Sequence, residues 1–164
     1  MREVRELYFF FSTPVSYRRF LKRFPTESSA IKYFGRFFNK QKSRRCVKCR
    51  CYQSKPYRKD NPRLRQCVRC GTTFSIFRNT VFQNSKSDFR YWMYVGYCMT
   101  FYYHCYFSIE QVTPMMLVKE IGCNSMDTIY RIHKIMSNEF TKRSTESIVF
   151  MRELFLPLIR NIKF

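Results

Sequence analysis

The sequence has few acidic side chains and few histidines. Its 164 residues include 11 Asp and Glu and 2 His, against 31 Lys and Arg, which gives a formal net charge of +20. Such an excess destabilises a compact chain by self-repulsion unless a polyanion is nearby, so we expect a nucleic acid or an anionic membrane surface as partner. His104 and His133 have no acid, thiol or serine in a matching arrangement, so neither is expected to be catalytic.

The sequence also lacks a convincing secretory signal and a convincing membrane span. Its first residues include acids, and the apolar run at residues 7–11 is short. Residues 91–109 contain no Asp, Glu, Lys or Arg, but they include six tyrosines, which belong at membrane interfaces and not at the centre of a span. We therefore predict a buried aromatic helix and no membrane partner. The expected location is intracellular: the nucleus in a eukaryote, or the cytoplasm with its nucleoid in a bacterium.

Aromatic residues and cysteines are abundant. Aromatics make up 19% of the chain and hydrophobic residues 45%, which excludes disorder by composition and predicts one domain or two small ones. Five of the eight cysteines lie in residues 46–71, as two C-x-x-C pairs and one additional thiol. Seventeen residues separate the pairs, which is the spacing of a zinc ribbon. The predicted ligands are Cys46, Cys49, Cys67 and Cys70.

The chemistry of zinc explains this spacing. Each C-x-x-C turn directs two thiolates at one point about 2.3 Å from the ion, and two turns complete a closed tetrahedron. A closed tetrahedron has no open position, so we predict one structural Zn²⁺. Two disulfides are the alternative, which is disfavoured because intracellular thiols stay reduced. Cys51 could replace Cys49, but the two regular pairs favour a spectator role; Cys98, Cys105 and Cys123 are expected to be small core or surface residues.

Positive charge is concentrated around these cysteines. Residues 41–70 contain eleven Lys and Arg and one acid, Asp60. A run this dense, interleaved with Tyr52 and Tyr57, indicates an interaction surface more often than a solvated loop. The candidate phosphate contacts are Arg44, Arg45, Lys48, Arg50, Lys55, Arg58, Arg65 and Arg69.

The pattern of the chain predicts an α+β fold, a small zinc ribbon of short antiparallel strands followed by an all-α helix-turn-helix bundle. A hairpin is expected from residues 63–68 and 72–77, with Gly71 supplying a positive φ, in a three-stranded ribbon that needs its metal to fold. A long helix is expected at 88–107, with residue 87 or 88 as its N-cap. The expected segments are a helical N-terminus at 1–40, the ribbon at 41–83, the helix-turn-helix at 84–141 and a tail or short helix at 142–164.

Two further helices form the predicted helix-turn-helix. Thr113 can cap a helix that opens with Pro114 and ends at Gly122, and Ser125 can cap the next. In that second helix Ile129, Ile132, Met136 and Phe140 have the spacing of a buried face. Such a helix enters the major groove with its N-terminal residues near base edges. The candidate base-proximal residues are Ser125, Thr128, Arg131 and Lys134.

The order of these features resembles a known family. From about Phe24 to Phe140, the chain is similar to the N-terminal part of the zinc-ribbon insertion-sequence transposases of bacteria and their eukaryotic relatives, the Merlin elements. The resemblance includes a leading helix in FPTESSAIKYFGRFF, the knuckles CVKC and CVRCG, the stretch TFSIFRNTVFQNSKSDFRYW, and the helix-turn-helix. Arg50 stands where the family usually has Gly, and Asn79 replaces the Gly before Thr80, although Asn tolerates positive φ.

The resemblance implies a DNA-binding module of transposase origin. In the family, an RNase-H-like catalytic domain follows, but after Phe140 this sequence offers only Glu146 and Glu153, so we expect no strand-transfer or nuclease activity. The remaining residues read as a short amphipathic helix or as a tail left by truncation. The expected partners are double-stranded DNA and a full-length transposase. The alternatives are a zinc-ribbon adaptor of a transcription or RNA-processing complex, and single-stranded nucleic-acid binding through Tyr52 and Tyr57.

Overall fold

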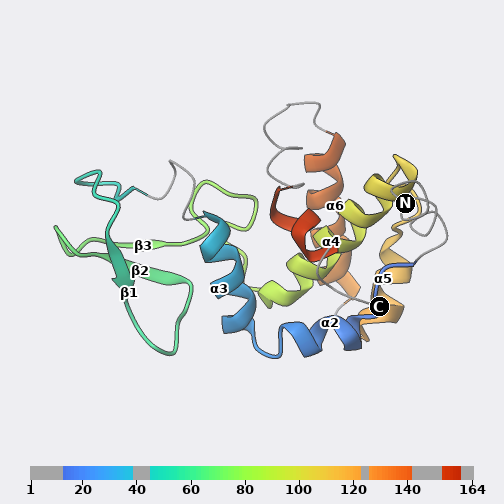
Figure 1. The fold of residues 1–164 in the computed structure, drawn as a ribbon, viewed down its shortest axis with the longest axis horizontal. Helices are drawn as coiled ribbons and strands as arrows, with labels where there is room; N and C mark the ends of the chain where they lie inside the picture. The colour runs from blue at the N-terminus through green and yellow to red at the C-terminus, as the bar shows by residue number, and fades with distance from the viewer. Residues whose placement is uncertain (1–12, 39–44, 123–125, 142–152, 160–164) are drawn as a thin grey trace, which may run out of the picture. The chain divides into compact units, whose positions relative to one another are not determined.

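The chain folds into two compact units of helices and a small antiparallel sheet, as a computed structural model shows for residues 13–38, 45–122, 126–141 and 153–159 (Figure 1). One unit comprises Phe24–Phe89 and carries the sheet; the other combines Met1–Arg23 with Arg90–Phe164, and the elements described in it are helices. The α+β class is therefore confirmed. The segment expected at 1–40 is divided between the two units, because the helix before the ribbon clusters with the ribbon.

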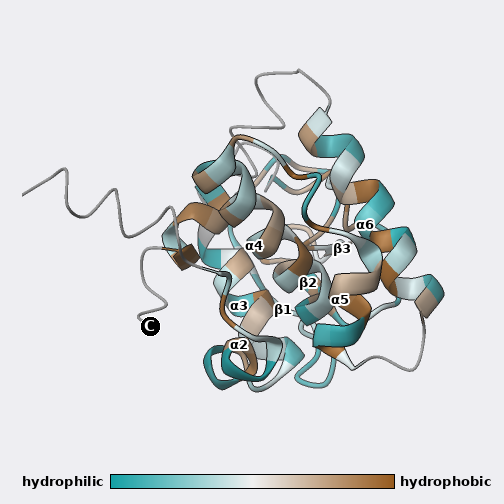
Figure 2. Ribbon diagram, turned by 90° about the vertical axis from the view of Figure 1, so that its right-hand side faces the viewer, coloured by the Kyte–Doolittle hydropathy of each residue, from teal (hydrophilic) through white to brown (hydrophobic). Residues whose placement is uncertain are grey.

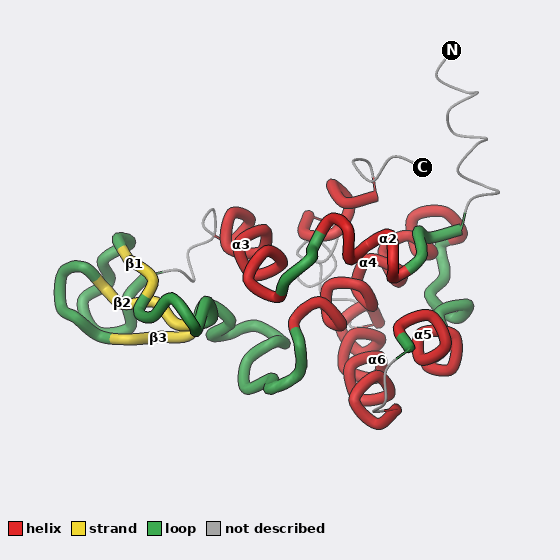
Figure 3. The backbone as a smooth tube through the Cα atoms, turned by 90° about the horizontal axis from the view of Figure 1, so that it is seen from below, coloured by secondary structure: helices red, strands yellow, loops and turns green. Residues whose placement is uncertain are grey.

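The first unit consists of one helix and three short strands that follow it. The strands pair antiparallel in the order β1-β2-β3, as the ribbon in Figure 1 shows. Loops make up most of this unit between its strands (Figure 3). The elements are α3 (Glu27–Phe38), β1 (Ser54–Pro56), β2 (Leu64–Cys67) and β3 (Thr73–Ser75). The predicted hairpin is confirmed, and α3 lies where a leading helix was expected.

Phenylalanine rings form the core of this unit. Phe34 of α3 contacts Phe77, Phe82 and Phe89 with ring centroids 5.3–5.4 Å apart, and these rings also contact one another. Edge-to-face pairs of this kind contribute about 0.5–1.5 kcal/mol each beyond the area that they bury. The cluster joins α3 to the loop after β3. The turn in that loop has Asn79 at φ 58°, so the expectation that the asparagine accommodates a positive φ there is confirmed.

Arg63 connects the same parts of the unit by polar contacts. Its guanidinium donates to a carboxylate oxygen of Glu27 and to the backbone carbonyls of Ser85 and Ser87. The same Glu27 oxygen accepts the backbone N–H of Phe89, 2.7 Å away. A partly buried charge with this many partners is strongly held in place. Arg63 therefore fixes the loop between the sheet and residue 89 against the start of α3.

The helical unit is built around one buried aromatic helix. Its elements are α2 (Tyr17–Arg23), α4 (Phe89–Tyr106), α5 (Pro114–Ile121) and α6 (Met126–Thr141), and residues 153–159 are also helical. Every residue of α4 from Trp92 to Phe101 is buried, which confirms the predicted buried aromatic helix. Two of its tyrosines hydrogen-bond the backbone of Val15: Tyr94 donates to the carbonyl at 2.9 Å, and Tyr97 accepts the N–H at 3.1 Å.

These contacts explain why an uncharged stretch is so rich in tyrosine. A buried phenol needs a partner, and here the backbone of the segment before α2 supplies it. Burial raises the pKa of Tyr97 to about 12, so its hydroxyl stays neutral. Within the described residues, no helix combines the length and the apolar character that crossing a bilayer requires.

The caps predicted for the first helix of this pair are present, whereas Ser125, the predicted cap of the second, lies outside the described residues. The side chain of Thr113 accepts the N–H of Met116 at 3.2 Å, Pro114 opens α5, and Gly122 closes it at φ 64°. The four residues predicted for the buried face of α6 are all buried. The hydropathy colouring of α6 shows the resulting polar and apolar bands (Figure 2).

The helix at 153–159 belongs to the core of this unit. Leu154, Phe155, Leu158 and Ile159 are buried, so residues 153–159 match the first of the two alternatives for this segment, a short helix, and not a tail. It meets α4 at Gly96, where an added Cβ would lie 2.3 Å from the Phe155 ring and 2.7 Å from Met136 of α6. Glycine is therefore required at position 96 by a close approach of three helices.

We predict that Gly96→Ala destabilises the protein although alanine is the better helix former. Relieving the overlap requires the Phe155 ring to move, and overpacking of this kind costs about 1–3 kcal/mol. The same substitution in a Phe155→Leu background should be neutral or stabilising, since alanine is favoured over glycine in a helix by about 1 kcal/mol. Chemical denaturation of the four proteins measures both effects. Equal destabilisation in the two backgrounds would contradict the close approach.

Candidate functional site

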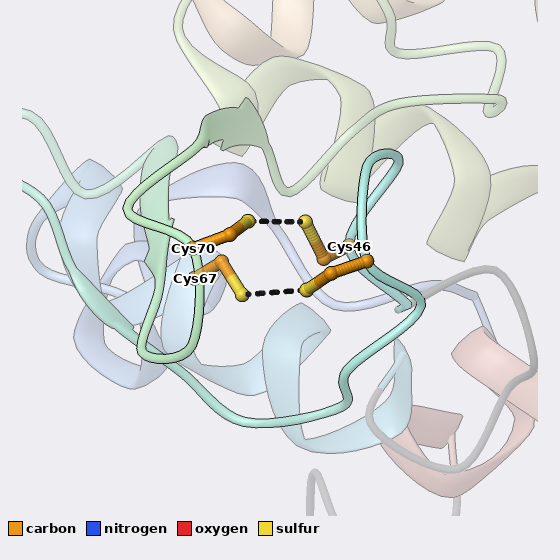
Figure 4. A group of neighbouring side chains, drawn as sticks. Cys46, Cys67 and Cys70 are labelled. Atoms are coloured by element: carbon orange, nitrogen blue, oxygen red, sulfur yellow. Dashed lines mark hydrogen bonds between the residues drawn. The ribbon is translucent and has the colours of Figure 1, made fainter.

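Four thiols converge between two turns of the first unit. The Sγ atoms of Cys46, Cys49, Cys67 and Cys70 all lie within 4.8 Å of one another. The shortest separations are 3.4 Å between Cys46 and Cys70 and 3.5 Å between Cys49 and Cys67, so each short contact joins one turn to the other (Figure 4). These separations exceed the roughly 2.05 Å of a disulfide bond, and all four cysteines are free.

The two turns have the same backbone geometry. In the first, the N–H of Arg50 donates to the carbonyl of Cys46, and the N–H of Cys46 donates to the carbonyl of Cys51. In the second, Gly71 and Thr72 occupy the equivalent positions relative to Cys67, and the distances agree within 0.1 Å. The repeat explains how two short segments present their thiols symmetrically. We call these turns the first and second knuckles.

The knuckles differ at the residue that follows the second cysteine of each. Gly71 has φ 71°, and an added Cβ would meet no atom of the described residues within 4 Å. Arg50 has φ 60°, so it adopts the left-handed conformation that glycine adopts most readily. The knuckle geometry is therefore kept although arginine replaces glycine at this position, at a backbone cost of about 1–2 kcal/mol.

The environments of two thiols shift their pKa values in opposite directions. Hydrogen bonds to the Thr72 side chain and backbone lower the pKa of Cys70 to about 6. For Cys49, a hydrogen bond from the Cys51 backbone favours the thiolate, but burial and the neighbouring thiols outweigh it and raise the pKa to about 12. Without a bound cation, Cys70 therefore ionises before Cys49, which holds its proton. A bound metal ion would stabilise the thiolate form of both.

The cluster fits a tetrahedral metal ion. Four sulfurs about 2.3 Å from a common centre lie about 3.8 Å from one another, close to the separations found here. The sulfurs come from two independent turns, and Cys46 and Cys67 are buried. The four cysteines are thus positioned to bind a metal ion, and the predicted ligand set is confirmed in its geometry.

The other described cysteines have different environments. Cys51 lies beside the cluster but is not one of the four, and its sulfur accepts the N–H of Gln53 at 3.4 Å. Cys98 and Cys105 are buried, and burial raises the pKa of both thiols, which keeps them protonated. Cys123 lies outside the described residues. His133 hydrogen-bonds the backbone carbonyl of Val112, as expected of a histidine with a structural role.

The predicted phosphate contacts are mostly exposed on the first unit. Lys48, Arg50, Lys55, Arg58 and Arg69 are exposed. Arg45 and Arg65 are half-buried, and Arg44 lies outside the described residues. Two of these arginines lie over the exposed tyrosines: Arg45 is 4.5 Å from the ring centre of Tyr52, and Arg58 is 5.4 Å from that of Tyr57. Each of these tyrosine rings thus already has a guanidinium over one face. A nucleic-acid base that stacked on that face would have to displace the guanidinium or lie beside it.

The candidate base-proximal residues lie on α6, except Ser125, which lies outside the described residues. Arg131 and Lys134 are exposed, and Thr128 is half-buried. Asp127 and Tyr130 are exposed on the same side of the helix. The face opposite the core therefore combines two cations with one acid and one aromatic ring.

Sequence reasoning missed two cations in the first unit. Lys32 and Arg36 are exposed on α3, one turn apart, and both lie next to the sheet-forming segment in a shared cavity. Their spacing of four residues was the available signal, but it acquires meaning only once α3 is placed against the strands.

No protein-family model, curated protein or solved structure matches this chain. These comparisons do not link the chain to transposases, and the resemblance rests on the sequence motifs alone.

We predict that Cys67→Ser removes metal binding and unfolds the first unit. Three thiolates leave the ion with an open position, and a sheet this small depends on its metal. Cys51→Ser is the matched control, because Cys51 is not among the four converging thiols. Elemental analysis of the purified variants should give one ion per chain for wild type and Cys51→Ser, and none for Cys67→Ser. Loss of metal in both variants would contradict the assignment.

A second pair of substitutions tests the knuckle geometry. Gly71→Ala should destabilise the metal-bound protein by about 1 kcal/mol, because the side chain has space but the backbone is strained. Arg50→Gly should stabilise it by up to about 1 kcal/mol, since it removes the same strain from the first knuckle. The chelator concentration at which half of each variant is unfolded, compared with that of wild type, measures both changes in stability. The expectation fails if the two substitutions shift stability in the same direction.

Proposed function

We propose that this chain is a DNA-binding module of transposase origin that recognises double-stranded DNA through a helix-turn-helix and a basic zinc ribbon. The observation that carries the proposal is the pair of consecutive helices α5, which is capped at both ends, and α6. The buried face of α6 is complete, and its opposite face leaves Arg131 and Lys134 exposed. In helix-turn-helix proteins, such a second helix lies in the major groove with its N-terminal residues at base edges.

Charge supports the same proposal. The segment 24–89 carries 16 of the 31 Lys and Arg residues but only 3 of the 11 acids. One of those acids, Glu27, already accepts hydrogen bonds from the Arg63 guanidinium and the Phe89 N–H. Such an excess of cations over acids supplies affinity for phosphates that does not depend on sequence. In this arrangement the first unit provides affinity and α6 provides specificity.

The metal in the proposed module is zinc, in a structural role. Four thiolates favour Zn²⁺ among the common intracellular metals, and a closed four-thiolate site leaves no position for a substrate. We propose no enzymatic activity for the chain. A partner that carries the catalytic domain, such as a full-length transposase, would perform any strand transfer.

DNA binding should be strongly salt-dependent. If about six to ten phosphates are neutralised, affinity should fall about 10³ to 10⁵-fold between 50 and 200 mM salt. Duplexes selected from a random pool by the protein, followed by fluorescence titration, provide the measurement. Sequence-blind binding with a shallow salt dependence would argue against the proposal.

Substitutions on α6 should reduce specificity as well as affinity. We expect Arg131→Ala with Lys134→Ala to lower discrimination by about 1–3 kcal/mol for each base pair that these side chains read. Lys22→Ala with Arg23→Ala on α2 removes the same charge from two exposed positions and should leave sequence preference unchanged. The comparison uses selected and scrambled duplexes at constant salt. If both variants show the same reduced preference, α6 does not read the sequence.

One observation favours the adaptor as a second candidate. Each knuckle exposes a valine directly after its first cysteine, Val47 at 53% and Val68 at 57% of its surface. Exposed apolar residues at equivalent positions of two turns suit a protein partner. Val47→Ser with Val68→Ser should then abolish a protein complex but leave DNA titrations unchanged, whereas the DNA-binding proposal expects no such complex.

A further inference from the structure

A cavity of about 460 Å³ lies within the first unit, between α3 and the sheet. Its size falls within the range of about 300–1,000 Å³ that is common for small-molecule sites. Three walls enclose it: one side of α3, one face of the sheet, and the loop between β1 and β2. We call this cavity the α3 groove. It is separate from the cysteine cluster, because none of the four metal-site cysteines lines it.

Most of the sheet wall is one row of cross-strand partners. Pro56 of β1 pairs with Arg65 of β2, which pairs with Phe74 of β3, so all three side chains point to the same face. Ile31 of α3 and Ile76 after β3 extend this apolar surface. At one side α3 approaches closely, since a Cβ on Gly35 would lie 3.2 Å from Ile76. The groove therefore has an apolar floor that includes one aromatic ring.

The cations of the groove lie around that floor. Among the described residues that line it, five are basic and none is acidic; the basic residues are Lys32, Arg36, Arg58, Lys59 and Arg65. Lys32, Arg36, Arg58 and Lys59 are exposed. Five like charges around one cavity repel one another, and an anion bound among them relieves the repulsion.

Arg65 is held rigidly at the sheet wall. Its guanidinium donates to the backbone carbonyl of Ser54 at 2.6 Å and to the Ser54 hydroxyl at 3.3 Å. Arg65 is half-buried, so its charge sits in a partly desolvated place where an anion interacts with it more strongly than in water. The sequence pattern assigned Arg58 and Arg65 to phosphates of a duplex, but the structure brings both to a groove with an apolar floor.

We propose that the α3 groove binds unpaired nucleotides of a DNA strand, with a base against Phe74 and its neighbours and the phosphates against Lys32, Arg36, Arg58 and Lys59. This proposal rests on the nucleic-acid function proposed above. A nucleotide combines a flat apolar base with an adjacent anion, which is the combination that the groove offers. A duplex hides its bases in the stack and would meet only the cations, and a free phosphate would not use the floor.

The test compares a groove variant with a charge-matched control in the full-length protein. Lys32→Glu with Arg36→Glu reverses two exposed charges that line the groove. The control, Lys55→Glu with Lys86→Glu, reverses two exposed charges that do not line the groove. Lys55 lies in β1 between Ser54 and Pro56, so its side chain is on the opposite face of the sheet. Retained metal content shows that each variant is folded.

Fluorescence anisotropy with a short labelled single strand and with a duplex of the same sequence gives the readout. We expect the groove variant to lose about tenfold or more in single-strand affinity relative to the control, while both variants lose duplex affinity equally. Phe74→Leu keeps the floor apolar but removes the ring, and it should cost about tenfold in single-strand affinity. Equal losses of single-strand affinity in the two charge variants would overturn the proposal.

Two further outcomes are decisive. If inorganic phosphate displaces the single strand as well as a nucleoside monophosphate does, the site takes phosphate alone and the proposal fails. If the duplex binds with dependence on Arg131 and Lys134 while the single strand does not bind, the groove assignment fails but the DNA-binding function stands. Absence of binding to either probe would overturn both.

Discussion

The convergence of four thiols is the constraint on which the rest of the first unit depends. The strands that it joins are three or four residues long, and Cys67 is the one residue in them that is fully buried. A sheet of this size buries too little apolar surface to offset the entropy of ordering its loops. The knuckles place the sulfurs within reach of one ion, and ion binding would supply the missing stability. Since the sheet forms one wall of the α3 groove, that surface depends on the same convergence.

Positive charge shapes the molecule in a second way. Glu27 and Arg63 form an ion pair that holds the loop before α4. Other arginines lie over tyrosine rings or bond backbone carbonyls, as Arg45 and Arg65 do. Such contacts fix a guanidinium without neutralising it. The cations therefore stay available to a polyanion while their positions are defined by the fold.

Local patterns in the sequence predicted a large part of the structure. The caps at Thr113 and Gly122, the buried face of α6, the hairpin around Gly71 and the cysteine cluster all follow from residue types at short spacings, which act through neighbouring backbone atoms. Arg50 shows where such rules meet their limit. An arginine does not predict a left-handed φ, but the hydrogen bonds of the knuckle impose it. The pattern of the residues after Phe140 allowed either a short helix or a tail, and the packing of Phe155 against Gly96 was not foreseeable from it.

The secondary structure, the metal ligands and the excess of positive charge follow from the order of the amino acids, because each depends on composition or on interactions within a few residues. The fold in three dimensions, in contrast, sets which side chains share a surface. The joining of Lys32 and Arg36 to Arg58, Lys59 and Arg65 around one apolar floor requires α3 to pack against strands that follow it by fifteen residues or more. The burial of Phe155 between α4 and α6 likewise depends on side-chain packing across long sequence separations. Long-range packing of this kind is set by the complementary shapes of side chains, which no local pattern encodes.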